Sequence, residues 1–547
     1  MNSHVVITRA PKINYREDYV ALPKNYGTHE YYEREDVQSI RDTVYKNLDD
    51  LDSHISFTKK LSSYKRILIK PNLVSVYHKS GLSEIDYPES TDPRVFDAIV
   101  SYIKQFNKNI AIVESSGKPM PTATSFKVSG IDRVAKYHNT KLYALENQPV
   151  IRYMLPKAEV MKEVYIPEIF NEVILGESFY ISVPKLKTNL YTTVTLGFKN
   201  AMGTIPYFMR ERNHTYLINK KIADLLYLFK PDLVIIDGII GGEGNTPAPV
   251  DPVDVGVIIS GNNSVEVDRI GTKVMGINPD DVALIKEAVN RGFNDDTVKV
   301  TGEIISIPFR KANPSLMDEF FAKQFPNVLV LAGHILKHAP KITDIYSVTP
   351  KIARELEIAC DGGCLAAARS GFDYIHYSPN PKYDFPLVII IGSGININNS
   401  RYWFDRDGNA YSAKEIRSLQ KPKLTLGNCA SIMDNCAKFK APGCCDPAKC
   451  MLAVTSAANI TFPLLSINNK ALGSLGACLI KNVAIRCFHI IRGKWVDCPR
   501  SHENKIFPIP ELDDIKKCHD YIYWKLPKMT ISLKRKCIKD QLSLLRM

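Results

Sequence analysis

Short runs of apolar residues, many of them β-branched, recur along the first half of the chain and are too short to be buried helices. The runs occupy residues 66–69, 110–113, 179–183, 233–236 and 255–259. They are apolar almost throughout and do not alternate with polar residues, which is typical of strands covered on both faces. The pattern therefore predicts a series of buried strands.

Helical patterns lie between several of these runs. Residues 90–106 begin with Ser90 or Thr91 as a candidate cap, have Pro93 in the first turn, and then place apolar residues four positions apart. Two later segments have the same pattern, residues 264–276 and 280–293. Alternating strands and helices predict an α/β domain with a largely parallel sheet and helices on both faces.

Two further apolar runs lie near residues 330 and 390, beyond the segment KANPSLMDEF. A chain of 547 residues is also too long for one hydrophobic core. We therefore expect two units. The first is the α/β domain, over residues 1–310, and the second is a cysteine-rich α/β or α+β domain with a basic tail, over residues 320–547.

Polar side chains follow the predicted strands at the points where these strands end. Lysines are frequent among them, and lysine binds phosphate or carboxylate as a point charge and loses its proton readily when buried. Ligands in an open α/β sheet bind beyond the carboxyl ends of the strands, so we expect a pocket there for a small anionic substrate. The competing interpretation is a set of ordinary solvated loops. The candidate catalytic residues are Lys185, Lys187, Lys199, His214 and Asp237, and the candidate substrate-binding residues are Lys70, Asn72, Ser115, Asn200 and Glu243.

Four ordered motifs in this part of the chain also resemble one family. IKPNLV, VPKLKTN with GFKNAMGTIP, IDGIIGGEGNTP, and SGNNSVEVDRIGTKVMG look, in that order, like family 362 of the domains of unknown function, over about residues 64–303. The resemblance implies an α/β domain and, because many members carry a ferredoxin-like segment, an association with iron–sulfur proteins. It implies no reaction. Asp268 is a further matching position, and Asn189 departs from the histidine expected after PKLKT.

All twelve cysteines lie at or after Cys360, and five of them fall within residues 427–450. The Cys-x2-Cys repeat of ferredoxins does not occur in the chain. Loops of six or seven residues with glycine and proline turns can nevertheless fold back on one metal ion or cluster. Three interpretations stay open: a metal site, thiol chemistry at the adjacent Cys444 and Cys445, and cysteines that pack as small apolar residues.

We expect the metal site, as a 4Fe–4S cluster or, in the alternative, as zinc. The family resemblance favours the cluster, and cytoplasmic thiols stay reduced, which favours metal over disulfides. The expected ligands are Cys429, Cys436, Cys444 and Cys450, and the reserve ligands are Cys445, Cys360 and Cys364.

The net charge of +13 is unevenly distributed. From Trp524 the tail holds seven Lys or Arg against one acid, Asp540, which gives +6. Such a tail could contact an anionic membrane surface, but a terminal helix that packs by its apolar side is the favoured interpretation. No zinc-finger spacing and no RNA-binding aromatic signature occurs, so we expect no nucleic-acid partner.

The N-terminal residues lack the basic-then-apolar pattern of a secretory signal. The apolar runs are far shorter than the roughly 20 residues of a membrane-spanning helix. We therefore expect a cytoplasmic protein. Its expected function is that of an iron–sulfur redox enzyme or electron-transfer protein that acts on a small anionic substrate and has a redox partner protein. The alternatives are a non-redox enzyme on an anionic metabolite with a structural zinc site, and a non-catalytic metal-binding scaffold.

Overall fold

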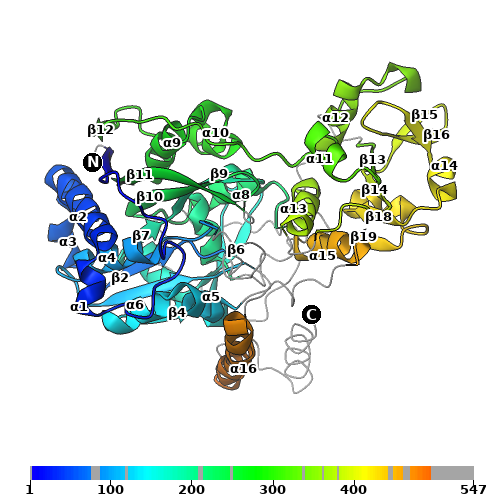
Figure 1. Cartoon of the computed structure of the whole chain (residues 1–547). Helices are drawn as coiled ribbons and strands as arrows, with labels where there is room; N and C mark the ends of the chain where they lie inside the picture. Colours follow the sequence, from blue (N-terminus) through cyan, green and yellow to red (C-terminus); the bar gives the residue numbers. More distant parts are fainter. Residues whose placement is uncertain are drawn as a thin grey trace.

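The computed structural model of the chain contains two extended sheets (Figure 1). The structure describes residues 3–74, 87–117, 121–206, 214–246, 250–334, 339–359, 363–377, 381–441, 447–459 and 469–493. Among these residues, the strands of the larger sheet lie between residues 4 and 301, and those of the second sheet lie between residues 328 and 441.

The main path of the larger sheet has the order β12-β1-β11-β10-β7-β2-β3-β4. The strands β10, β7, β2, β3 and β4 run parallel to one another, whereas β11 runs antiparallel to both of its neighbours. The bounds are β1 (His4–Arg9), β2 (Arg66–Pro71), β3 (Ile110–Glu114), β4 (Lys141–Ala144), β7 (Ser178–Val183), β10 (Leu233–Glu243), β11 (Asp251–Gly261) and β12 (Lys299–Thr301).

The sheet is thus mixed, with a parallel centre, where the sequence predicts a largely parallel sheet. The connection between β10 and β11 explains the difference, because it spans only residues 244–250. A parallel return needs a crossover of a dozen or more residues, whereas so short a link returns the chain antiparallel.

The chain reverses its direction of winding at the centre of this sheet. From β2 it adds β3 and then β4 on one side, and it later returns to place β7 and then β10 on the other side. Such a reversal between two adjacent parallel strands leaves a crevice outside their carboxyl ends. Here the switch point falls between β2 and β7.

Helices cover both faces of the larger sheet, as the sequence predicts. On β2, Ile67 and Ile69 point into one core and Leu68 points into the other, because successive side chains of a strand alternate. One face carries α1 (His29–Glu33), α2 (Glu35–Ile55), α3 (Phe57–Leu61), α4 (Pro93–Ile103), α5 (Thr122–Ser129) and α6 (Ile131–Tyr137). The other carries α7 (Asn171–Ile174), α8 (Ile218–Leu225), α9 (Ser264–Val274), α10 (Ala283–Asn290) and the hairpin of β5 (Val150–Met154) and β6 (Glu163–Pro167).

The second sheet has β13, β14, β18 and β19 in parallel and β16 antiparallel to β13. The apolar runs near residues 330 and 390 form β13 and β14. The strands are β13 (Val328–Ala332), β14 (Leu387–Ile391), β15 (Ile395–Ile397), β16 (Ser400–Phe404), β17 (Ala410–Ser412), β18 (Lys423–Leu426) and β19 (Phe439–Ala441). The division of the chain near residue 310, with a separate cysteine-rich domain after it, stays a prediction.

Helices also cover both faces of the second sheet. The helices α11 (Glu319–Gln324), α12 (Pro350–Ile358), α13 (Cys364–His376) and α15 (Pro447–Ala457) share one core with it, and α14 (Ala413–Ser418) lies on the opposite face. The last described helix, α16 (Asn469–Ile491), lies against α5 of the larger sheet (Figure 1). Within the described residues, no helix is both long enough and apolar enough to cross a membrane.

Candidate functional site

Four of the predicted site residues lie at the carboxyl ends of the parallel strands. Lys70 is the penultimate residue of β2, and the chain leaves β7 at Val183 to enter β8 (Lys185–Asn189). β8 continues alongside β10, where Lys185 is opposite Asp237. The switch point between β2 and β7 is therefore flanked by Lys70 on one side and by Lys185, Lys187 and Asp237 on the other.

Lys70 is the centre of a buried polar network. Its Nζ lies 2.8 and 2.9 Å from the two carboxylate oxygens of Glu114, at the end of β3, and 2.8 Å from Oδ1 of Asn200. Asn72 Nδ2 donates to the same Asn200 oxygen at 3.2 Å. Burial raises the pKa of Glu114, and the Lys70 charge partly offsets that effect. The backbone N–H of Ser115 donates to Glu114 at 2.7 Å, so Ser115 joins the network through its main chain.

Lys185 forms a second buried ion pair. Its Nζ lies 2.9 Å from Oδ2 of Asp237, and both side chains are fully buried. The same carboxylate oxygen accepts a hydrogen bond of 2.7 Å from the backbone N–H of Asp92. Burial raises the pKa of Asp237 and the Lys185 charge opposes this. The pair ties β10 to the segment that precedes α4.

Lys187 is held differently from the other two lysines. Its side chain is 1% exposed, and its Nζ donates to the backbone carbonyl of Glu89. Burial, followed by repulsion from the Lys199 charge, lowers the pKa of Lys187 to about 7; Glu89 acts in the opposite direction and Lys185 adds to the lowering. An amine with this pKa can both accept and donate a proton near neutral pH.

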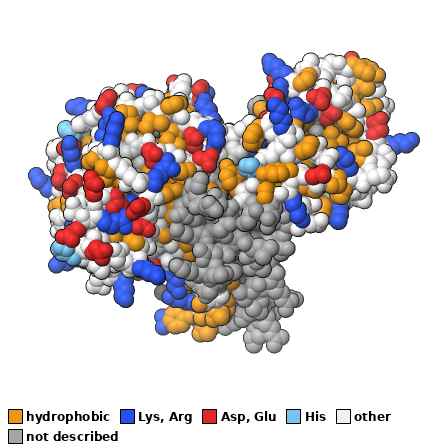
Figure 2. All heavy atoms as spheres, viewed as in Figure 1, with side chains coloured by type: hydrophobic (Ala, Val, Ile, Leu, Met, Phe, Trp, Pro, Cys, Tyr) orange, Lys and Arg blue, Asp and Glu red, His pale blue; other side chains and the backbone are white. Residues whose placement is uncertain are grey.

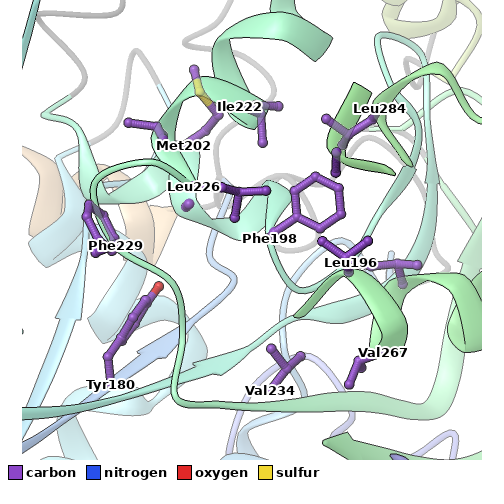
Figure 3. Close-up of a cluster of buried hydrophobic side chains, with 14 of the residues drawn as sticks. Tyr180, Leu196, Phe198, Met202, Ile222, Leu226, Phe229, Val234, Val267 and Leu284 are labelled. Carbon is purple, nitrogen blue, oxygen red and sulfur yellow. The ribbon is translucent and has the colours of Figure 1, made fainter. Parts of the chain in front are cut away.

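Lys199 and Asn200 are carried by a 3₁₀ helix, η4 (Lys199–Thr204). Figure 3 shows Phe198 and Met202, on either side of these two residues, within a cluster of buried apolar side chains that includes Leu226 and Leu284. This anchoring holds Asn200 against Lys70, while Lys199 is half-buried. Asp268 supports the start of η4, since its carboxylate accepts hydrogen bonds from the N–H groups of Gly197 at 2.6 Å and Phe198 at 3.3 Å.

The segment before α4 belongs to the site, although the sequence suggested only a helix cap there. The cap is Asp92, whose carboxylate accepts from the N–H of Arg94 at 2.9 Å. Ser90 and Thr91 were the predicted caps and are buried instead; Thr91 Oγ1 accepts from the N–H of Asn72 and donates to the carbonyl of Val183, both at 2.8 Å. The start of α4 thus packs against the ends of β2 and β7, and a helix N-terminus favours a nearby anion.

Lys70, Lys185, Lys187 and Lys199 form what we call the lysine cluster. Two other predicted residues are not shown to be part of it. The carboxylate of Glu243, half-buried at the end of β10, accepts a hydrogen bond of 2.7 Å from the backbone N–H of Arg310. His214 is half-buried and adjoins residues 207–213, which lie outside the described part of the chain. Asn189 forms the turn after β8, where its Oδ1 accepts from the N–H groups of Tyr191 and Thr192.

The predicted metal ligands are only partly described. Cys436 packs with Val388 and Ile390 on one face of the second sheet, and Cys450 packs with Leu387 and Ile389 on the other. These two thiols are therefore separated by the sheet. Cys429 is exposed in η8 (Asn428–Met433). Cys360, Cys444 and Cys445 lie outside the described residues, as does the basic tail over residues 524–547.

One reserve ligand does lie beside a predicted ligand. Cys450 Sγ is 3.4 Å from the backbone carbonyl of Cys364, where α15 packs on α13. Among the side chains that the structure describes, no group of three or more His, Cys, Asp or Glu is arranged to hold a metal ion. The complete four-cysteine set stays a prediction.

Comparison with known proteins gives a relative and a family for the part of the chain that contains the lysine cluster. The thylakoid-associated protein sll1697 of Synechocystis sp. is 24% identical over 245 residues, which cover 43% of this chain and 71% of that protein. No solved structure matches the chain. The family model described as Domain of unknown function (DUF362) matches residues 67–273, which confirms the family that the sequence motifs predict for this part of the chain.

Proposed function

We propose that this protein is an enzyme that binds a small anionic metabolite at the lysine cluster and uses Lys187 as its acid–base group. The observation that carries the proposal is the contrast among the lysines. Lys70 and Lys185 each face a carboxylate within 2.9 Å, so their charges are balanced. Lys187 instead donates to a neutral carbonyl and is repelled by Lys199.

The two lysines that repel one another are suited to an anionic ligand. A carboxylate or phosphate near Lys187 and Lys199 would relieve their mutual repulsion and would favour the charged form of Lys187. The first turn of α4 adds a positive dipole on the same side. Binding of the ligand should therefore raise the pKa of Lys187 and draw a proton onto its amine, which the amine could then deliver to the bound metabolite.

The test is proton uptake on binding. Titration calorimetry with inorganic phosphate and with small mono- and dicarboxylates, in buffers of different ionisation enthalpy at about pH 8, should show uptake of up to about one proton per ligand. Lys187→Met should abolish the uptake, because no amine remains to be charged. Lys65→Met is the matched control. Lys65 is exposed and immediately precedes β2, so it lies at the amino-terminal end of that strand, opposite to the end that carries Lys70. Binding without proton uptake in the native chain, or uptake that survives Lys187→Met, would contradict the proposal.

A second candidate function is supported by the neighbouring Cys364 and Cys450. Under this proposal the protein is an iron–sulfur redox enzyme of the cytoplasm that exchanges electrons with a partner protein; zinc in a structural role is the alternative. The support is that α13, which begins with Cys364, also contacts the larger sheet, where Asn245 Nδ2 donates to Asp373 at 3.0 Å. The separation of Cys436 from Cys450 does not favour their joint ligation of one cluster.

Elemental analysis tests this second candidate. The chain purified without oxygen should contain iron and acid-labile sulfide, or zinc under the alternative. Serine at Cys364 or at Cys450 should remove the metal. Cys478→Ser is the control, because Cys478 is buried in α16, which lies against α5. A metal-free native chain would exclude both forms of the proposal.

A further inference from the structure

The helix α16 turns two polar side chains inward, Asn482 and Arg486. The side chains of Cys478, Asn482, Arg486 and Ile490 are buried, and their spacing of four residues places them on one face. Asn482 Oδ1 accepts a hydrogen bond of 2.6 Å from Asn147 Nδ2, and the Arg486 charge acts on the buried Glu146. The Asn482 amide thus attaches this helix to η2 (Leu145–Asn147), and the helix also packs on α5.

The outward side of α16 is apolar. Ile480 is 71% exposed, Phe488 48% and Ile491 76%, and the exposed Ala484 lies between the first two. These residues recur at intervals of three or four and therefore form one stripe along the helix. A surface helix in a globular protein has the reverse arrangement, with its apolar stripe facing the core. An apolar stripe that is left outward indicates a surface that makes contact with something else.

Positive charge accompanies the stripe. Lys481 and Arg492 are exposed beside it, and the Arg492 guanidinium lies 4.0 Å from the centre of the Phe488 ring. No acidic residue occurs in the sequence between Asp446 and Asp497, whereas six Lys or Arg do. At the lower edge of Figure 2, where α16 lies, hydrophobic and basic side chains are exposed together. The contacting surface should therefore be anionic.

We propose that α16 attaches the protein to the surface of an anionic lipid bilayer. Ile480, Phe488 and Ile491 enter the boundary between headgroups and acyl chains, and Lys481 and Arg492 contact the headgroup phosphates. The stripe is too narrow for a stable protein interface, which buries roughly 20–30 residues on each side. The helix lies in the plane of the bilayer, since its inward side is held by the Asn482–Asn147 hydrogen bond.

Vesicle binding by the full chain tests the proposal. The protein should co-sediment with vesicles of mixed phosphatidylcholine and phosphatidylglycerol far more than with phosphatidylcholine alone, and added salt should weaken the binding. The double substitution Ile480→Asp with Phe488→Asp should lower the partition by at least about tenfold, because two charges then face the acyl boundary. Both side chains are exposed, so the fold should be retained, which circular dichroism checks.

The matched control adds the same two charges elsewhere. Phe320→Asp with Tyr346→Asp replaces exposed aromatic residues, 63% and 89% exposed, in the part of the chain that carries the second sheet. This variant should bind vesicles as the native chain does. Three results would overturn the proposal: no preference for anionic vesicles, equal binding by both variants, or a dimer in solution that only the α16 variant disrupts. Equal binding would assign the attachment to the basic tail, and the dimer would assign the stripe to a second copy of the chain.

Discussion

A carbonyl oxygen as the acceptor for Lys187 has a direct chemical consequence. Lys70 and Lys185 have carboxylate acceptors instead, Glu114 and Asp237, each within 2.9 Å. A peptide carbonyl also accepts a hydrogen bond from a neutral amine, although the bond from an ammonium ion is stronger. The fold can therefore bury Lys187 without a charge on its amine, and the cost of desolvating an ammonium ion is avoided.

This arrangement predicts a pH dependence of stability that depends on Lys187. The unfolded chain keeps the Lys187 proton up to the ordinary pKa of 10.5, whereas the folded chain releases it above about pH 7. Between these two values the unfolded state binds more protons, so the free energy of unfolding rises with pH by up to about 1.4 kcal/mol per pH unit from this group. Urea denaturation at several pH values, native chain against Lys187→Met, measures the difference. Parallel curves for the two proteins would show that Lys187 stays charged in the fold.

The search for polar residues directly after predicted strands identifies most of the lysine cluster from sequence, but it does not identify the residues that surround the cluster. Lys70, Lys185 and Lys187 follow runs that are recognisable as strands. Because ligands bind beyond the carboxyl ends of parallel strands, the sequence predicts that these lysines lie together. Glu89 and Asp92 are not identified in this way, because the ESTDP segment has the composition of an ordinary helix start. The Lys187 amine donates to the main-chain carbonyl of Glu89 in this segment. This contact depends on tertiary packing alone.

At the scale of elements, η4 is the part that must fit most closely against the strand ends. A Cβ atom at Gly203 would lie 2.5 Å from Lys70 Nζ and would also overlap the carboxylate of Glu114. No backbone restriction applies, since the φ of Gly203 is not positive. Glycine is required there because of space, and the requirement comes from a buried ion pair that cannot move without losing its partners.

Substitution of this glycine should therefore weaken the fold. Gly203→Ala should lower the free energy of unfolding by about 1–3 kcal/mol, because it overpacks the Lys70–Glu114 pair. Gly476→Ala is the control: a Cβ there meets nothing within 4 Å, and alanine in a helix is favoured by about 1 kcal/mol over glycine. Chemical denaturation compares the two. If both variants gained stability, η4 would have to be farther from Lys70 than this structure places it.

Element types are predicted well from the sequence, and element directions less well. The apolar run at residues 255–259 lies within β11, but its antiparallel pairing follows from the length of the link after β10 and not from its composition.

The spacing of the cysteines is less informative about their positions in the fold. Cys436 and Cys450 are close in sequence, yet they pack on opposite sides of the second sheet because β19 passes between them.

At the scale of the whole molecule, the two sheets are connected next to the lysine cluster. Tyr374 of α13 packs with Tyr87 and Val250, and Tyr87 is two residues before Glu89. The Asn245–Asp373 hydrogen bond lies in the same junction. A cavity of about 300 Å³ is also lined by residues of both parts of the chain, among them Leu217 and Ala366. The position of the carbonyl that receives Lys187 thus depends on both parts of the chain.

Loss of the contact between Tyr374 and Tyr87 should therefore also affect the lysine cluster. Tyr374→Ala should cost about 2–4 kcal/mol of stability, as truncation of a buried aromatic residue does, and should also weaken anion binding, because Glu89 loses its support. Tyr346→Ala, at a side chain 89% exposed, should change stability by less than about 0.5 kcal/mol. Denaturation and titration calorimetry measure the two effects. Unchanged anion affinity in Tyr374→Ala would show that the larger sheet forms the site alone.

The lysine cluster also has a consequence for how the chain folds. Its hydrogen bonds join residues far apart in sequence: 130 residues separate Lys70 from Asn200, and 145 separate Asp92 from Asp237. Contacts of such long range carry a high loop-closure cost and form late. A chain emerging from the ribosome cannot assemble this cluster until β10 has been synthesised. An anion that binds here would stabilise only the completed sheet and leave earlier intermediates unaffected, so its binding would serve as a reporter of the last step of folding.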